Sequence, residues 1–460
     1  SFTMNLTSPA DTTAIIGIPK EAGVAITGID VNGVSVWVGG KPGKAPPGLA
    51  FVKETEHYLT FSAAPGTWDV RVQKKITPGK WIWGAGTSDN RWICFRKKID
   101  FGEVPEKAIA RIAVDSKYWL WVNGELAVFE GGLNRGPAPG AGYYDEIDLA
   151  PYLQSGENTF AILAWYWGNE GRNNVDSGAG GLLFEADWAE APLFSDRSWK
   201  VKRHPAYGST VDDRPSYLYG GHNIGFDARV DIADWFSPPY DDADWEAAEE
   251  KGVPPCKPWG PLEARPIPQW KDFGLRSYTN DGALPGEGGG GPITAELPHA
   301  AMVSPYLEID APAGLTIDIR TDRFRVQGGP GDGKKFYNSH HTEYTTREGI
   351  QAFESLDWLF GEKVIYTIPE GVKTRSLKYR ETGYGCDFRG SFECDDPFLN
   401  TLWEKSRRTL YICMRDNYMD CPDRERGQWI GDVSSQVLQT FYCLDRQSDK
   451  LTRSEEHTSE

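Results

Sequence analysis

Apolar and polar positions alternate in short runs over the first 80 residues, as in residues 24–31 and 68–75, and Gly or Pro separates the runs. Alternation with a period of two predicts β-strands that bury one face. We therefore expect residues 1–80 to form an N-terminal β region.

The strand pattern is stronger between residues 81 and 190. Residues 108–115 and 118–122 predict two strands, and Asn123-Gly124 predicts the tight turn of a hairpin, because both residues tolerate a positive φ. Residues 158–167 are apolar enough to predict a strand buried on both faces. Together these elements predict a jelly-roll-like β-sandwich.

The next two stretches differ in composition. Residues 191–291 are rich in Pro, Gly and Asp and end in four glycines, which predicts an irregular connection and linker. Residues 292–392 contain alternating runs again, at 306–310 and 362–368 among others, and predict a second β-sandwich.

Helical signals begin at residue 393. Asp396 followed by Pro397 is typical of a helix start, and the next apolar residues follow helical spacing: Leu399, Leu402, Trp403 and Leu410. A second helix is predicted from Asp432, with four apolar residues buried at intervals of three and four: Val433, Val437, Phe441 and Leu444. Residues 420–432 then fall in the loop between the two helices.

Composition narrows the classes of partner. The net charge of −17 argues against nucleic acid and anionic membranes, which bind clustered Lys and Arg. No apolar run reaches the roughly 18 residues of a membrane-spanning helix. Seven scattered cysteines without a CxxC pair indicate free thiols and no zinc site. No signal peptide pattern is visible, so the sequence leaves the choice between a cytoplasmic and an exported protein open.

Two further motifs resemble binding sites but do not predict one. Residues 328–334 fit GxxxxGK, but Lys335 replaces the Ser or Thr that would hold magnesium, so we interpret them as a β-hairpin loop. His340 and His341 with Glu343 lack a recognised metal spacing and are interpreted as sandwich polar residues. No cofactor and no metal site is predicted.

The loop at 420–432 concentrates chemistry in thirteen positions: Asp420, Asp423, Arg424, Glu425, Arg426, Trp429 and Asp432. Glycoside cleavage needs a carboxylic acid held protonated and further acceptors for sugar hydroxyls, and an aromatic wall suits the apolar face of a sugar. Crowded carboxylates raise one another's pKa, and arginines lower them. A solvated charged loop explains the same residues equally well.

The spacing Asp420-Cys-Pro-x-Arg424-Glu425-x-x-x-Trp429-x-Gly-Asp432 resembles the signature of the bacterial inverting α-L-rhamnosidases, glycoside hydrolase family 78. Residues 390–400 resemble the entry to their catalytic domain, and residues 118–124 resemble part of their galactose-binding-like sandwich. The resemblance covers residues 81–450. It implies that residues 393–452 begin an (α/α)6 six-hairpin toroid.

The resemblance also implies roles. Glu425 matches the general acid, and Asp420, Arg424, Trp429 and Asp432 match residues that line the rhamnose pocket. The implied substrates are rhamnose-containing oligosaccharides, polysaccharides or glycosides. Where the family usually has Leu-Gly before the Trp, this chain has Gly427-Gln428, which puts the sugar specificity in question.

Residues 453–460 read RSEEHTSE, which is the codon-by-codon translation of a common sequencing adapter. We therefore expect the natural protein to continue past residue 452, with the general base of the implied mechanism further along. On that expectation the present chain does not hydrolyse rhamnosides by itself. The alternatives are a glycosidase for another neutral sugar, a non-catalytic glycan-binding protein with a degenerate helical domain, and a structural β-sandwich protein.

Overall fold

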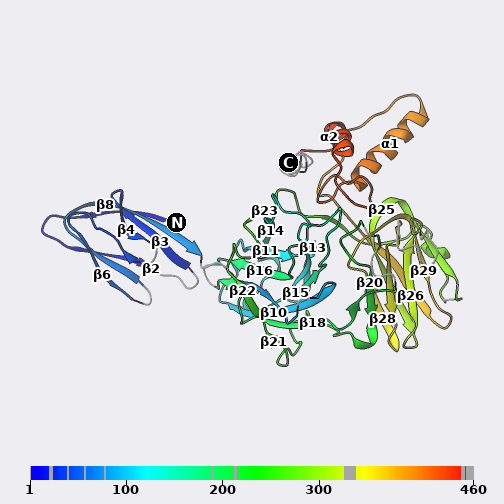
Figure 1. The fold of residues 1–460 in the computed structure, drawn as a ribbon, viewed down its shortest axis with the longest axis horizontal. Helices are drawn as coiled ribbons and strands as arrows, with labels where there is room; N and C mark the ends of the chain where they lie inside the picture. The colour runs from blue at the N-terminus through cyan, green and yellow to red at the C-terminus, as the bar shows by residue number, and fades with distance from the viewer. Residues whose placement is uncertain are drawn as a thin grey trace.

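The computed structural model describes residues 2–19, 24–38, 41–55, 58–76, 79–86, 88–188, 191–211, 215–216, 218–287, 289–325, 338–446 and 451. Within these residues the chain is mostly β, and the helices α1 and α2 follow the last strand (Figure 1). In the described part of the chain, neither helix is long and apolar enough to cross a membrane. The predicted order of β regions followed by helices is therefore confirmed.

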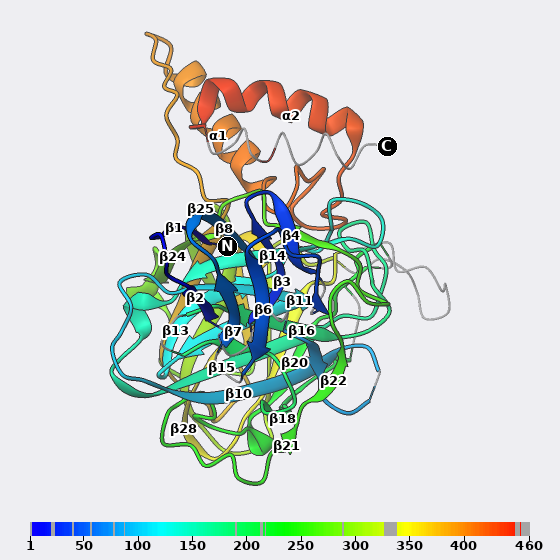
Figure 2. The same cartoon turned by 90° about the vertical axis from the view of Figure 1, so that its left-hand side faces the viewer.

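The N-terminal β region consists of two sheets with a core of their own. This region lies at the left of Figure 1, apart from the rest of the chain. In Figure 2, where that side faces the viewer, it lies in front of the other sheets. Its core contains Ile18, Ile29, Leu59 and Trp68, all buried. The five-stranded sheet has the order β1 (Phe2–Ser8), β8 (Gly66–Ile76), β3 (Val24–Val31), β4 (Val34–Val38) and β5 (Lys41–Pro42), and the three-stranded sheet the order β2 (Ala14–Pro19), β7 (Tyr58–Ala63) and β6 (Leu49–Glu54).

The next unit is a sandwich of two sheets. One sheet has the order β13 (Glu125–Gly131), β12 (Lys117–Val122), β15 (Gly156–Tyr166), β10 (Arg91–Phe101), β18 (Lys200–Arg203) and β21 (Glu246–Ala247). The other has the order β22 (Glu249–Gly252), β9 (Trp81–Trp83), β16 (Gly181–Ala186), β11 (Ile109–Asp115), β14 (Gly142–Asp148) and β23 (Leu262–Ala264), with β17 (Leu193–Phe194) beside β16.

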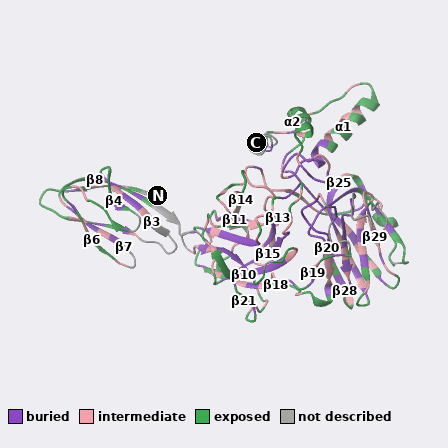
Figure 3. Cartoon of the chain, viewed as in Figure 1, coloured by how far each residue is buried: buried purple, intermediate pink, exposed green. Residues whose placement is uncertain are grey.

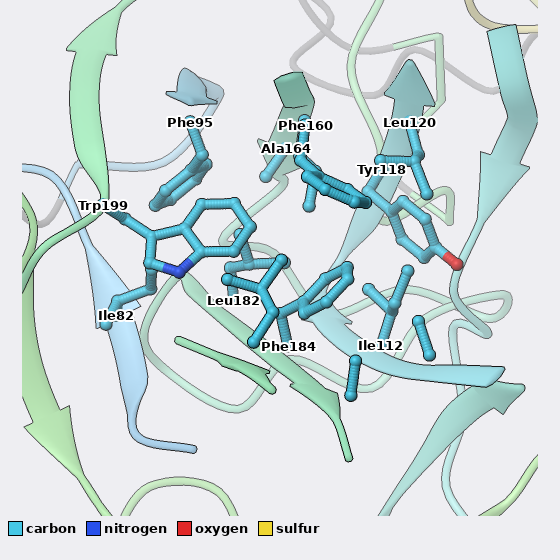
Figure 4. Close-up of a cluster of buried hydrophobic side chains, with 14 of the residues drawn as sticks. Ile82, Phe95, Ile112, Tyr118, Leu120, Phe160, Ala164, Leu182, Phe184 and Trp199 are labelled. Atoms are coloured by element: carbon cyan, nitrogen blue, oxygen red, sulfur yellow. The ribbon is translucent and has the colours of Figure 1, made fainter. Parts of the chain in front are cut away.

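The core of this sandwich lies between its two sheets. Phe95 and Phe160 from one sheet and Ile112 and Phe184 from the other meet in Figure 4 with Trp199. Burial on both faces of β15 is confirmed, because every residue from Asn158 onward is buried. The Asn123-Gly124 turn is confirmed too, with φ of 54° and 85°.

The prediction that residues 191–291 form an irregular linker is wrong. They supply strands to the sandwich (β17, β18 and β21–β23) and to the next sheet: β19 (Tyr207–Gly208), β20 (Ile224–Asp227) and β24 (Lys271–Ser277). Most of these strands have only two to four residues, too few to show an alternation in sequence. Buried tryptophans, among them Trp199, Trp235, Trp245 and Trp259, hold the connecting segments in place. Where the domains begin and end stays a prediction.

The second β region is one hydrogen-bonded network of nine strands. Its order is β19, β20, β27 (His341–Thr345), β26 (Thr316–Thr321), β29 (Leu359–Thr367), β25 (Pro292–Ala311), β30 (Lys373–Gly383) and β24, with β28 (Gly349–Glu354) beside β25. Strand β25 pairs with β29 along its first half and with β28 and β30 along its second. The alternating runs predicted as strands in this region are confirmed.

Both predicted helices exist. In α1 (Pro397–Ile412) the carboxylate of Asp396 accepts a hydrogen bond from Phe398 N, as the Asp-Pro start predicts. Helix α2 (Ile430–Cys443) begins two residues before Asp432. Its contact face is narrow, so Val433 and Val437 are only partly buried, and the predicted burial of Phe441 is wrong because that side chain is 63% exposed. Figure 3 shows much of α2 in the colour of exposed residues.

A buried ion cluster joins the helical segment to the first sandwich. The carboxylate of Glu130 on β13 accepts a hydrogen bond from Lys117 Nζ of β12 at 2.6 Å and another from Arg415, which follows α1. Arg415 also donates to Thr382 Oγ1 of β30 at 3.2 Å, so one guanidinium contacts the first sandwich and the second β region. Burial alone would raise the pKa of Glu130, but Arg415 and Lys117 outweigh it and lower the pKa to about 2.

Replacing Arg415 by Met should lower the free energy of unfolding by about 3–5 kcal/mol, because Glu130 keeps a buried charge without one of its two partners. Urea unfolding followed by circular dichroism measures the loss. Lys98→Met is the matched control: it breaks an exposed pair with Glu157 and should cost at most about 1 kcal/mol. Equal effects of the two substitutions would show that the cluster does not hold the helical segment.

Candidate active site

The loop between α1 and α2 forms one wall of a cavity of about 770 Å³. The five residues selected from the sequence all line it: Asp420, Arg424, Glu425, Trp429 and Asp432. Cys421 and Asp423 line it from the same loop, and Arg323, Arg325 and Asn338 line it from the second β region. The structure thus brings the predicted residues together and adds a wall that the sequence did not indicate.

Glu425 is the most enclosed carboxylate of the loop, with a side chain 11% exposed. Its two oxygens have different partners. Oε1 accepts a hydrogen bond from Arg424 Nη2 at 2.6 Å, and Oε2 accepts one from Trp429 Nε1 at 3.2 Å. The Trp contact fixes the carboxylate against an aromatic ring, whereas the Arg424 side chain is half exposed and lies toward solvent.

Asp420 closes the loop on itself. Its Oδ1 accepts a hydrogen bond from Gly427 N at 3.0 Å, and its own N–H donates to Gly427 O at 2.9 Å. Burial, and to a lesser extent the neighbouring charge of Glu425, raise the pKa of Asp420 above its ordinary value. The crowding of carboxylates that the sequence suggested therefore acts on Asp420.

Arg426 anchors the loop from beneath. It adopts a φ of 52°, which is uncommon for a residue with a side chain. Its guanidinium lies 3.3 Å from the ring centre of Trp358 and donates to Trp358 O at 3.1 Å and to Tyr219 Oη at 3.2 Å. A third hydrogen bond returns to Pro422 O within the loop. Because Arg426 is buried, these contacts fix the backbone that carries Glu425.

The first sandwich reaches the site through Arg172. Its guanidinium lies 4.9 Å from the ring centre of Trp429, a cation–π contact. Gly427 lies under the same side chain, since a Cβ atom on it would come within 3.0 Å of Arg172 Cβ and 3.5 Å of Trp429 Nε1. This gives the Gly427-Gln428 departure a structural reason, because a larger residue at 427 would displace Arg172 or Trp429.

Sequence reasoning missed the residues that come from the β regions. Arg172 lies in the connection after β15, and Arg323, Arg325 and Asn338 flank residues 326–337, which include the GxxxxGK segment. That segment lies outside the described residues. Arg323 and Arg325, directly before a Gly-rich stretch, were the available signal in the sequence, but their distance from residue 420 along the chain concealed their connection to the site.

The two histidines are accounted for within the second β region. Both are buried, and His341 contacts Ser339 O at 2.8 Å and Glu343 Oε1 at 3.3 Å. Burial, followed by the charge of Arg426, lowers the pKa of His340 well below its ordinary value. Within the described ranges, no three His, Cys, Asp or Glu side chains gather in a way that could hold a metal ion. All seven cysteines are free thiols.

Comparison with known proteins points in one direction. Residues 387–450 match the family model described as the bacterial alpha-L-rhamnosidase 6 hairpin glycosidase domain. A curated alpha-L-rhamnosidase from Formosa agariphila is 26% identical over 381 residues, which cover 76% of this chain and 38% of the relative. The chain is a relative of the α-L-rhamnosidases of glycoside hydrolase family 78.

Solved rhamnosidase structures share the fold. The family 78 rhamnosidase of Bacillus sp. GL1 superposes with a TM-score of 0.69 at 18% identity, over 80% of this chain and 62% of that one. The Streptomyces avermitilis α-L-rhamnosidase, solved with L-rhamnose, gives 0.60 at 17% identity, over 98% of this chain and 49% of that one. This rhamnosidase relative therefore spans less than two thirds of the length of the proteins it matches.

Gly427→Ala should loosen the loop, because the added methyl forces Arg172 or Trp429 to move, a change that costs about 1–3 kcal/mol where packing is tight. Hydrogen exchange measured by mass spectrometry should show faster exchange in peptides covering residues 413–430. Gly431→Ala is the control, since its Cβ would meet nothing within 4 Å and Ala favours a helix. Unchanged exchange in Gly427→Ala would rule out close packing at this position.

Proposed function

We propose that the full-length protein is a glycoside hydrolase that removes terminal α-L-rhamnose from oligosaccharides, polysaccharides or glycosides. The observation that carries the proposal is the enclosed Glu425 carboxylate, held between Arg424 and Trp429 in a cavity that Asp420 and Asp432 also line. The match of residues 387–450 to a rhamnosidase catalytic domain supports the same reaction.

Glu425 is proposed as the general acid that protonates the leaving oxygen of the glycoside. In the free site Arg424 Nη2 donates a hydrogen bond to Oε1 from a half-exposed side chain. A bound sugar that displaces the Arg424 side chain would give the glycosidic oxygen access to Oε1. The hydrogen bond from Trp429 Nε1 to Oε2 leaves Oε1 to carry the proton toward the substrate.

Other residues of the loop and of the first turn of α2 are proposed to bind the sugar. Asp420 and Asp432 offer acceptors for rhamnose hydroxyls, and the 40% exposed Trp429 offers an aromatic face for the apolar side of the ring. An inverting mechanism needs a second carboxylate about 6.5–9.5 Å from the acid, with a water between them. We propose that this base follows later in the six-hairpin domain, as the family resemblance implies.

Glu425→Gln tests the acid, in the protein extended through its source DNA to the length of its relatives. We expect a loss of about 10²–10⁴ in kcat/KM on rhamnosides with poor leaving groups, because Gln cannot supply the proton. Aryl rhamnosides with acidic leaving groups need less protonation and should lose less. Glu404→Gln is the matched control, since Glu404 pairs with Arg407 on α1 at an exposed position.

Equal rates for wild type and Glu425→Gln would remove Glu425 from the mechanism. The 460-residue chain serves for a separate binding test with methyl α-L-rhamnoside, in which Trp429→Ala should weaken binding if the pocket is placed correctly. Binding without turnover by the extended wild-type protein would favour the glycan-binding alternative.

A further inference from the structure

The wall of the cavity opposite the catalytic loop is cationic. Arg323 and Arg325 follow β26 of the second β region, and both line the cavity that Asp420, Glu425 and Asp432 line from the other side. We call these two arginines and Asn338 the arginine wall. The proposed chemistry at Glu425 does not use them.

Local contacts present both arginines from one short segment. Arg325 N donates to Asn338 O at 2.8 Å, and Asn338 Nδ2 donates to Arg323 O at 3.2 Å, so the segment is tied at both ends. Phe324 lies between them and packs against the ring of His341, with 5.7 Å between ring centres. Because Phe324 packs away from the cavity against His341, the side chains of Arg323 and Arg325 on either side of it line the cavity.

The positive charges of the wall are only partly compensated within the second β region. Arg323 forms a long ion pair with Asp322, with 3.7 Å between Nε and Oδ2, and this buried Nε has no hydrogen-bond partner. Asp322 is engaged elsewhere, because its Oδ1 accepts from Glu362 N and Lys363 N. In the part of the chain that the structure describes, no carboxylate pairs with Arg325, whereas Arg424 across the cavity is paired with Glu425.

Two guanidinium groups therefore line one cavity, Arg323 with a long ion pair and Arg325 without a carboxylate partner among the described residues, in a chain of net charge −17. Neutral sugars do not require them, since hydroxyls are bound by Asp, Asn and Trp side chains as readily. Guanidinium groups match the planar, doubly accepting geometry of carboxylates and the oxygens of sulfates. A structural role for the charges is also weak, because the segment is held by its backbone, Asn338 and Phe324.

We propose that the arginine wall binds an anionic group, a carboxylate or a sulfate ester, on the sugar residue next to the rhamnose. This inference rests on the proposed function and narrows its substrate class to acidic rhamnose-containing glycans. Rhamnose would lie against the carboxylates of the loop, and the anionic neighbour against Arg323 and Arg325. The opposite charges of the two walls would also fix the direction in which the glycan enters.

Isothermal titration of the 460-residue chain tests the inference with three disaccharides that share a non-reducing α-L-rhamnose. The second sugar is glucose, glucuronic acid or glucose sulfate. Wild type should bind one or both anionic disaccharides at least about tenfold more tightly than the neutral one, as expected for a hydrogen-bonded charge pair. The preference should shrink as salt is added. The two anionic arms distinguish a carboxylate from a sulfate ligand.

Arg325→Gln and Arg323→Gln should each remove about tenfold of affinity for the preferred anionic disaccharide and leave the neutral one within twofold. Arg375→Gln is the matched control, because Arg375 is a half-exposed arginine of the same sheet that pairs with Glu308 outside the cavity. Near-ultraviolet circular dichroism checks that each variant is folded. Arg325 is exposed, so its replacement keeps the test valid if Arg323→Gln does not fold.

Equal affinity of wild type for all three disaccharides would overturn the inference and leave the proposed function standing. Tight binding of free glucuronic acid or glucose sulfate, without rhamnose, would overturn it as well, because the wall would then be an independent anion site. Failure of all three disaccharides and of methyl α-L-rhamnoside to bind would count against the proposed function and the inference together.

Discussion

The candidate site depends on how one arginine packs. The Arg426 guanidinium lies flat against Trp358, donates to Tyr219 and Trp358, and returns a hydrogen bond to Pro422 in its own loop. A buried cation is tolerated only where its donors are satisfied and an aromatic face or counter-charge replaces water. The loop therefore cannot take its observed shape without Tyr219 and Trp358, which belong to segments far away in the sequence.

A second buried arginine, Arg415, also fixes the helical segment to the β regions. Arg415 bonds to Glu130 and Thr382, and the charge of Glu130 is shared with Lys117. Arg426 and Arg415 both lie near the Trp358 ring, so two buried cations add directional contacts to the apolar cluster that packs the helical segment against the second β region. Such contacts are directional, which suits a loop whose side chains must be placed accurately.

Much of this architecture could be predicted, and the failures have physical causes. A continuous apolar run predicted β15, and the Asp396-Pro397 start predicted α1, because these signals are local. The short strands between residues 191 and 291 escaped, since their partners, and not their own patterns, make them strands. In the site, the loop residues were found through their spacing. The arginine wall was not, because only the folded chain brings residue 325 to residue 425.

Because the site combines Arg172, the arginine wall (Arg323, Arg325 and Asn338) and residues 420–432, its parts leave the ribosome at very different times. N-terminal domains generally fold first during synthesis. The β regions would thus stand ready when the loop emerges, and Arg426 would dock onto surfaces that are already formed. The loop at 420–432, which is made last, then folds against surfaces that already exist. Its carboxylates are brought together by this docking and not by a search within an unfolded chain.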